Sequence, residues 1–134
     1  MSSPLALDGL DHVALYVSDL ARSERWYTET LGLRRVHAEV WGRQPVMLVA
    51  GRSGVALFQA RSPALTSPPP PAVPGTMSHL AFHVAPSAFA SWRTALAARN
   101  LDVEFQDHQV TQSLYFRDPD GHQLEITTET SRGG

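Results

Sequence analysis

The chain has 134 residues, 43% of them hydrophobic, which suits one domain with a substantial core. A formal net charge of −2 argues against a nucleic-acid-binding surface, and no apolar run reaches the roughly 18 residues of a membrane span. The sequence contains no cysteine, which excludes disulfides, thiolate metal sites and cysteine nucleophiles. We therefore expect a cytoplasmic protein without membrane or nucleic-acid partners, in which nitrogen and oxygen atoms hold any metal.

The first half of the sequence predicts a strand followed by a helix. The segment HVALYV alternates apolar residues with others, Ser18 and Asp19 are candidate N-caps, and Gly32 is typical of a helix C-terminus. Three further strand-like segments follow, near residues 33–40, 45–50 and 54–59. The predicted order of this half is βαβββ.

The second half repeats the same plan. A strand is followed by a cap region at Pro86 and Ser87, then by a helix, with Asn100 at the position that Gly32 takes in the first half. Three strand-like segments again follow, near residues 101–107, 110–117 and 122–128. Between the halves, residues 62–76 include four consecutive prolines and predict an extended spacer.

An internal repeat supports this division. Shifting the chain by 67 positions superimposes identical residues from the first strand to the last: His12 on His79, Ala14 on Ala81, Val17 on Val84, Gly54 on Gly121, and Leu57 on Leu124. We therefore predict an α+β fold in which two tandem βαβββ modules form a cupped mixed β-sheet with the helices outside. The chain is expected to be a single domain, with module 1 at about 9–60, the proline-rich linker at 62–76 and module 2 at about 77–128.

Three potential metal ligands are predicted to face the concave side of this sheet. Glu125 lies between Leu124 and Ile126, so period-2 alternation points its carboxylate away from a core that holds the two apolar side chains. His12 and His79 occupy equivalent positions at the start of the two repeated strands. A single histidine or glutamate in a strand is more often structural or solvated. Two imidazoles and one carboxylate together match the facial triad that binds Fe(II), Mn(II) or Co(II) and leaves coordination positions open.

Three segments resemble the vicinal oxygen chelate superfamily: LDHVALYVSDLARSERWYTETLGL, SHLAFHV and YFRDPDGHQLEI. This superfamily contains glyoxalase I, fosfomycin-resistance enzymes, bleomycin-binding proteins and extradiol dioxygenases. The resemblance implies the paired βαβββ fold, a homodimer, a small-molecule substrate and metal ligands at His12, His79 and Glu125. It does not select the reaction, because members differ in chemistry on one scaffold.

Three of these classes fit the sequence incompletely. Glyoxalase I has a fourth metal ligand, a carboxylate, at the position where the repeat places Phe58 in this chain. Phenylalanine can neither bind metal nor carry a proton. The next residue, Gln59, would point to the other face of the strand. Bleomycin-binding proteins lack the metal triad. Fosfomycin-resistance enzymes share the triad and a motif similar to SLYFRDPDGHQLE, but they carry a hydroxyl residue where this chain has Ala14. Arg117 alone is a weak site for a dianionic phosphonate.

The extradiol dioxygenases match through their C-terminal signature. The corresponding residues are His108, Leu114, Tyr115, Asp118, Pro119, Gly121 and Glu125, and Gln106 departs from the pattern. By this resemblance Tyr115 would hydrogen-bond a substrate oxygen and His108 would act as acid or base. The alternatives are a solvent-facing His108 at a strand end and a core Tyr115 with a bonded hydroxyl.

The sequence thus predicts a metal-dependent enzyme, and ring cleavage of a small catechol by dioxygen is its leading reaction. Fe(II) is the favoured metal, with Mn(II) or Zn(II) as alternatives. The alternative reactions are fosfomycin-resistance-like thiol transfer or epoxide hydration, and a glyoxalase-like lyase reaction; a non-enzymatic binding protein is the alternative of a different class. Two other histidines are candidates: His83 either lines the cavity or is buried, and His37 on the second strand could reach it.

Overall fold

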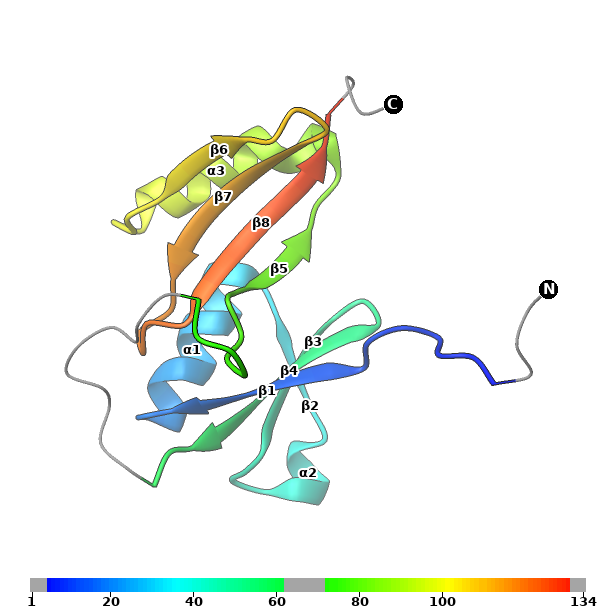
Figure 1. Cartoon of the computed structure of the whole chain (residues 1–134). Coiled ribbons are helices and arrows are strands. Elements are labelled where there is room, and N and C mark those ends of the chain that lie inside the picture. The colour runs from blue at the N-terminus through cyan, green and yellow to red at the C-terminus, as the bar shows by residue number, and fades with distance from the viewer. Residues whose placement is uncertain (1–4, 62–71, 131–134) are drawn as a thin grey trace. The chain divides into compact units, whose positions relative to one another are not determined.

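The computed structural model describes residues 5–61 and 72–130. The chain divides into two compact units, Met1–Ala64 and Leu65–Gly134 (Figure 1). Residues 62–71, which hold most of the predicted proline-rich linker, lie outside the described part. In the described ranges, no helix is long and apolar enough to cross a membrane.

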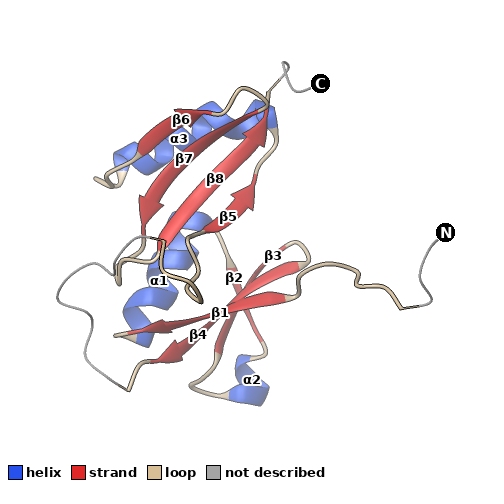
Figure 2. Cartoon of the chain, in the orientation of Figure 1, coloured by secondary structure: helices blue, strands red, loops and turns tan. Residues whose placement is uncertain are grey.

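The first unit is a mixed four-stranded sheet with a long helix packed on it (Figures 1 and 2). Its strands stand in the order β1-β4-β3-β2; β1 is parallel to β4, and the other neighbours are antiparallel. Helix α1 packs on β3 and β4. The elements are β1 (His12–Val17), α1 (Leu20–Leu31), β2 (Arg34–Val36), α2 (Ala38–Trp41), β3 (Val46–Ala50) and β4 (Ser53–Gln59).

The predicted caps and strand faces of this unit are confirmed. Asp19 is the N-cap of α1, where its side chain accepts a hydrogen bond from the Arg22 N–H at 3.0 Å. Gly32 ends the helix in the left-handed conformation with φ 73°. On β1, Leu15 and Val17 are buried, while the alternate residues, including His12, face the other side.

The second unit repeats the arrangement with strand order β5-β8-β7-β6. Strand β8 is parallel to β5 and antiparallel to β7, so it is an interior strand. Helix α3 packs on β8, and Asn100 after it has the predicted left-handed backbone, with φ 60°. The elements are β5 (Leu80–His83), the short 3-10 helix η1 (Pro86–Ala88), α3 (Phe89–Ala98), β6 (Glu104–Asp107), β7 (Thr111–Arg117) and β8 (Gln123–Glu129). The βαβββ plan is confirmed in both halves.

Two predicted strands are too long. The strand expected over 33–40 ends at Val36, because His37 takes a left-handed conformation with φ 64° and begins the short helix α2. His37 therefore lies after the second strand, where its ring contacts the Trp41 ring in a tilted arrangement, with 5.0 Å between ring centroids. The strand expected over 101–107 begins at Glu104, which leaves residues 101–103 outside the sheet.

Candidate metal centre

The Glu125 carboxylate is the acidic ligand of the predicted site, and only 7% of the residue is exposed. It lies on interior strand β8, opposite Ala81 on β5 and Tyr115 on β7. The Nε2 atom of His79, which immediately precedes β5, is 2.9 Å from the Glu125 Oε1 atom. The structure thus brings two predicted ligands together, an imidazole nitrogen and a carboxylate oxygen, and this donor pair suits Mn, Fe or Zn.

Ser113 fixes the second oxygen of this carboxylate. Its side chain is fully buried on β7, and its hydroxyl donates a hydrogen bond of 2.5 Å to the Glu125 Oε2 atom. One carboxylate oxygen therefore faces Ser113 while the other faces His79. A polar neighbour of this kind holds a ligand in one orientation and lowers the cost of burying its charge.

Both predicted histidine ligands are anchored through their Nδ1 atoms by the preceding residue. His12 Nδ1 lies 2.7 Å from the Asp11 Oδ2 atom, and His79 Nδ1 lies 2.9 Å from the Ser78 hydroxyl oxygen. A carboxylate accepts from Nδ1–H, and a hydroxyl fits either ring tautomer, because it both donates and accepts. In each case Nε2 is the atom that remains for a metal.

His12 belongs to the first unit, whereas His79 and Glu125 belong to the second. Gly54 is its direct neighbour on β4, and a Cβ atom at Gly54 would lie 3.3 Å from the His12 Cβ and 3.0 Å from the Met47 Sδ. The absence of a side chain at Gly54 therefore gives His12 its place. Over residues 5–61 and 72–130, no group of three or more His, Asp or Glu side chains forms a cluster able to hold a metal ion. The triad therefore stays a prediction, with two of its members in contact.

Tyr115 and His108 lie beside the His79–Glu125 pair. The His108 Nε2 atom is 3.2 Å from the Tyr115 hydroxyl oxygen, and the rings of Tyr115 and His79 meet edge to face at 5.7 Å between centroids. Burial, and next the negative charge of Glu125, raise the pKa of the Tyr115 phenol. Near neutral pH the phenol is therefore protonated and can donate a hydrogen bond.

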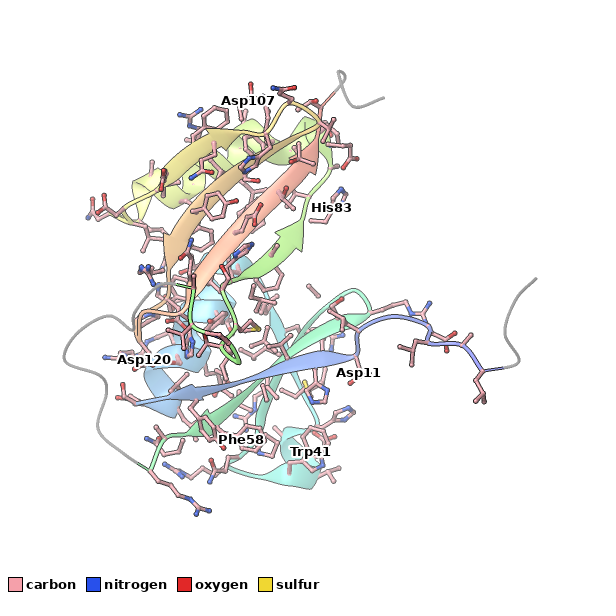
Figure 3. All side chains as sticks on the ribbon, in the orientation of Figure 1. Asp11, Trp41, Phe58, His83, Asp107 and Asp120 are labelled. Carbon is pink, nitrogen blue, oxygen red and sulfur yellow. The ribbon has the colours of Figure 1, made fainter. Side chains whose placement is uncertain are left out.

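The strand position that corresponds to Glu125 in the first unit carries no polar group. Phe58 lies there on β4 (Figure 3). It pairs with Tyr16 on β1, and the centroids of the two rings are 6.4 Å apart. Gln59 does not substitute for a ligand, because its amide donates to the Ser18 carbonyl oxygen at 2.8 Å. The expectation that Gln59 points to the other face agrees with this contact.

Two other candidates, His83 and Arg117, have polar partners outside the predicted triad. His83 (Figure 3) is exposed rather than buried. Its Nε2 atom is 2.6 Å from the Glu129 Oε2 atom. The hydrogen bond from His83 lowers the pKa of the Glu129 carboxyl. Arg117 bonds to the adjacent turn, where its guanidinium donates to the Gly121 carbonyl oxygen at 2.6 Å.

Sequence reasoning missed three residues that orient the predicted ligands: Asp11, Ser78 and Ser113. The internal repeat could have revealed Asp11 and Ser78, because the shift of 67 positions superimposes them and each directly precedes its histidine. Alternation held the signal for Ser113, which lies two residues before Tyr115 and so shares its strand face.

Comparison with known proteins identifies the family. Residues 9–126 match the Glyoxalase/Bleomycin resistance protein/Dioxygenase superfamily. The chain belongs to this superfamily. It is 28% identical to the metallothiol transferase FosB of Staphylococcus epidermidis, over 94% of this chain and 85% of the relative. It is 35% identical to the glutathione transferase FosA of Serratia marcescens, over 90% of this chain and 80% of the relative.

Solved structures of superfamily proteins agree in fold. A glyoxalase/dioxygenase from Nostoc punctiforme has a TM-score of 0.79 and 23% identity, and the match covers 98% of this chain and 99% of that one. The fosfomycin resistance protein FosX of Mesorhizobium loti has a TM-score of 0.69 and 25% identity, over 94% of this chain and 96% of that one.

Proposed function

We propose that the chain is a metal-dependent transferase that adds a thiol to a small electrophile such as an epoxide, and that hydration is the variant in which water replaces the thiol. The observation that carries the proposal is the pairing of His79 Nε2 with Glu125 Oε1 at 2.9 Å, in a chain similar to thiol transferases. This proposal takes the place of catechol ring cleavage as the leading reaction, because both of those relatives are thiol transferases.

His12, His79 and Glu125 would hold the divalent ion, with Asp11, Ser78 and Ser113 fixing their orientation. When bound, such an ion supplies Lewis-acid polarisation of a substrate oxygen. The relatives' names do not specify iron, so Mn(II) and Zn(II) stand beside Fe(II) as candidate metals.

In the proposed reaction the thiol sulfur forms a bond to one ring carbon of the epoxide, the carbon–oxygen bond breaks, and the thiol proton ends on the released oxygen. Tyr115, protonated and beside Glu125, would donate a hydrogen bond to that oxygen. His108, 3.2 Å from the Tyr115 hydroxyl, would move the proton, since imidazole exchanges protons near neutral pH.

The test measures thiol consumption. Protein loaded separately with Mn(II), Zn(II) and Fe(II) is incubated with glutathione and a panel of epoxides that includes fosfomycin, and the adduct is detected by mass spectrometry. We expect adduct formation with at least one metal and its loss in Glu125→Gln. Equal thiol consumption in the wild type and in Glu125→Gln would overturn the proposal.

Extradiol ring cleavage remains the second candidate, because the contact between His108 and Tyr115 agrees with the dioxygenase signature. Oxygen uptake by Fe(II)-loaded protein across a catechol panel tests it. Uptake that requires Tyr115 and His108, with no thiol consumption in the first assay, would favour ring cleavage.

A further inference from the structure

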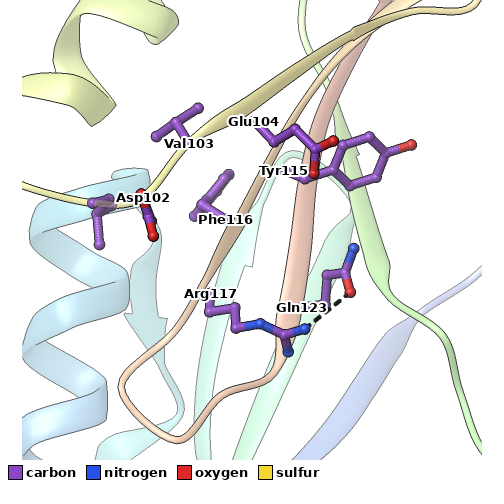
Figure 4. A pocket seen from close by; sticks show the side chains of 8 residues that line it. Asp102, Val103, Glu104, Tyr115, Phe116, Arg117 and Gln123 are labelled. Atoms are coloured by element: carbon purple, nitrogen blue, oxygen red, sulfur yellow. Dashed lines mark hydrogen bonds between the residues drawn. The ribbon is translucent and has the colours of Figure 1, made fainter. Parts of the chain in front are cut away.

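The two β7 residues beside Glu125 have different surroundings. Tyr115, directly opposite Glu125, lines a cavity of about 510 Å³ (Figure 4). This cavity lies where two strands part, because the pairing of β6 with β7 ends at Glu104 and Tyr115 and residues 101–103 leave the sheet. Ser113 has no exposed surface and does not line the cavity. A ligand in the cavity therefore meets Tyr115 but not the serine that holds Glu125.

A second hydroxyl group lies behind Ser113. Thr127 is directly opposite Ser113 on β8, and it is two residues after Glu125 and so shares its strand face. The Thr127 Oγ1 atom is 3.2 Å from the Ser113 Oγ atom and 3.3 Å from the Gln112 carbonyl oxygen. A row of oxygen atoms thus leads from the Glu125 carboxylate through two hydroxyls to the backbone of β7.

The number of available protons decides how the two hydroxyls are oriented. A serine or threonine hydroxyl has one proton to donate and two lone pairs. The Ser113 Oγ atom is 2.5 Å from the Glu125 carboxylate and 3.2 Å from Thr127, and a charged acceptor forms the stronger bond. The Ser113 proton therefore goes to Glu125. The proton between the two hydroxyls is then the one that Thr127 carries.

We infer that Thr127 is a positioning residue of the candidate metal centre: its hydroxyl donates to Ser113 and so directs the Ser113 proton onto the Glu125 Oε2 atom. Hydrogen bonds in a chain polarise one another, so a serine that accepts from Thr127 is a stronger donor to the carboxylate. The Oε1 atom, which lies beside His79, is left for the metal. The inference rests on the proposed function, because only there is Glu125 a metal ligand.

The test is a double-mutant cycle on Mn(II) affinity, measured by isothermal titration into chelator-treated full-length protein. Thr127→Val removes the hydroxyl and keeps a β-branched side chain, and we expect it to weaken Mn(II) binding roughly two- to tenfold through loss of one hydrogen bond. Thr127→Ser keeps a hydroxyl and should restore most of the affinity. In Ser113→Ala protein, Thr127→Val should have no further effect, because the residue through which Thr127 acts is absent.

Thr128→Val is the matched control. Thr128 is the next residue of β8, is buried on the other face of the strand, and donates a hydrogen bond of 2.7 Å to the Val84 carbonyl oxygen. This variant should lower the free energy of unfolding, measured by urea titration, and leave the Mn(II) affinity of the folded protein unchanged. The same titration shows that each Thr127 variant folds.

The outcomes separate this inference from the reaction. If Thr127→Val binds Mn(II) like the wild type, or weakens binding equally with and without Ser113, the positioning role is wrong while thiol transfer stands. A Thr127→Ser variant that binds as weakly as Thr127→Val also contradicts the role of the hydroxyl. If the cycle behaves as expected but no thiol is consumed, the positioning role stands and the reaction is wrong. Wild-type protein that binds no divalent ion would overturn the metal centre and this inference together.

Discussion

Replacing Ser113 with alanine removes the hydrogen bond that fixes one oxygen of the Glu125 carboxylate. The bond is 2.5 Å long, the serine is fully buried and Glu125 is only 7% exposed, so water has little access to replace the lost donor. A hydrogen bond to a charged group is worth about 1.5–3 kcal/mol, and about 1.4 kcal/mol is a factor of ten in affinity. We therefore expect Ser113→Ala to weaken divalent metal binding by about 10- to 100-fold, in line with the effect of removing a ligand's hydrogen-bond partner.

Metal affinity is measured by competition with a fluorescent chelator, and chemical denaturation of each variant shows that it folds. Ser53→Ala, an exposed serine at the start of β4, is the matched control and should bind metal like the wild type. If Ser113→Ala folds and binds metal with unchanged affinity, then Ser113 does not orient a metal ligand, and the reasoning from its contact with Glu125 fails.

Three further predictions test other parts of the account. In Gly54→Ala, the new Cβ would meet the His12 Cβ at 3.3 Å, so metal affinity should fall while the free energy of unfolding, measured by urea titration, changes by about 1 kcal/mol or less. Tyr115 ionisation is measured in metal-free protein as the tyrosinate absorbance change that Tyr115→Phe removes. This change should lie above pH 10, because the pKa of the Tyr115 phenol is raised from 10.0. The contribution of Tyr115 to stability is therefore present below pH 10 and is lost as the pH rises through the higher pKa of the folded state. A step at or below pH 10 would contradict this. Sedimentation should show a homodimer at micromolar concentration, since each sheet has edge strands, and a monomer there would refute the expected assembly.

Alternation and the internal repeat predicted the parts of the fold that depend on local pattern. Glu125 faces away from the core formed by its neighbours on the other side of β8, and the first-unit helix begins at Asp19 and ends at Gly32 as expected. These features follow from the alternation of side chains between the two faces of a strand and from the residues that cap helices. Both can be read directly from the sequence. His79 meets Glu125 for the same reason, because the repeat places each on a defined strand face.

The errors occur where one backbone conformation overrides a pattern. The segment after Val36 still alternates like a strand, yet His37 adopts φ 64° and turns the chain into a four-residue helix. That left-handed step depends on tertiary surroundings, which composition does not record. The late start of β6 at Glu104 is of the same kind, and it opens the cavity that the sequence did not predict.

Choice of reaction was the least predictable step. The spacing from His108 through Tyr115 to Glu125 matches the dioxygenase signature, and the structure does bring His108 and Tyr115 within 3.2 Å. A tyrosine–histidine pair beside a carboxylate serves proton transfer in either chemistry, so spacing alone does not separate ring cleavage from thiol transfer.

The central proposal is that His12, His79 and Glu125 supply the ligands of one divalent ion per chain. The most direct test is isothermal titration of Mn(II) into chelator-treated protein and into His12→Ala, His79→Ala and Glu125→Ala, with Glu39→Gln as an exposed control. The account predicts one site per chain in the wild type and the control, and loss of tight binding in each of the three alanine variants, all of which remain folded. Unchanged stoichiometry and affinity in any one of these alanine variants would contradict it.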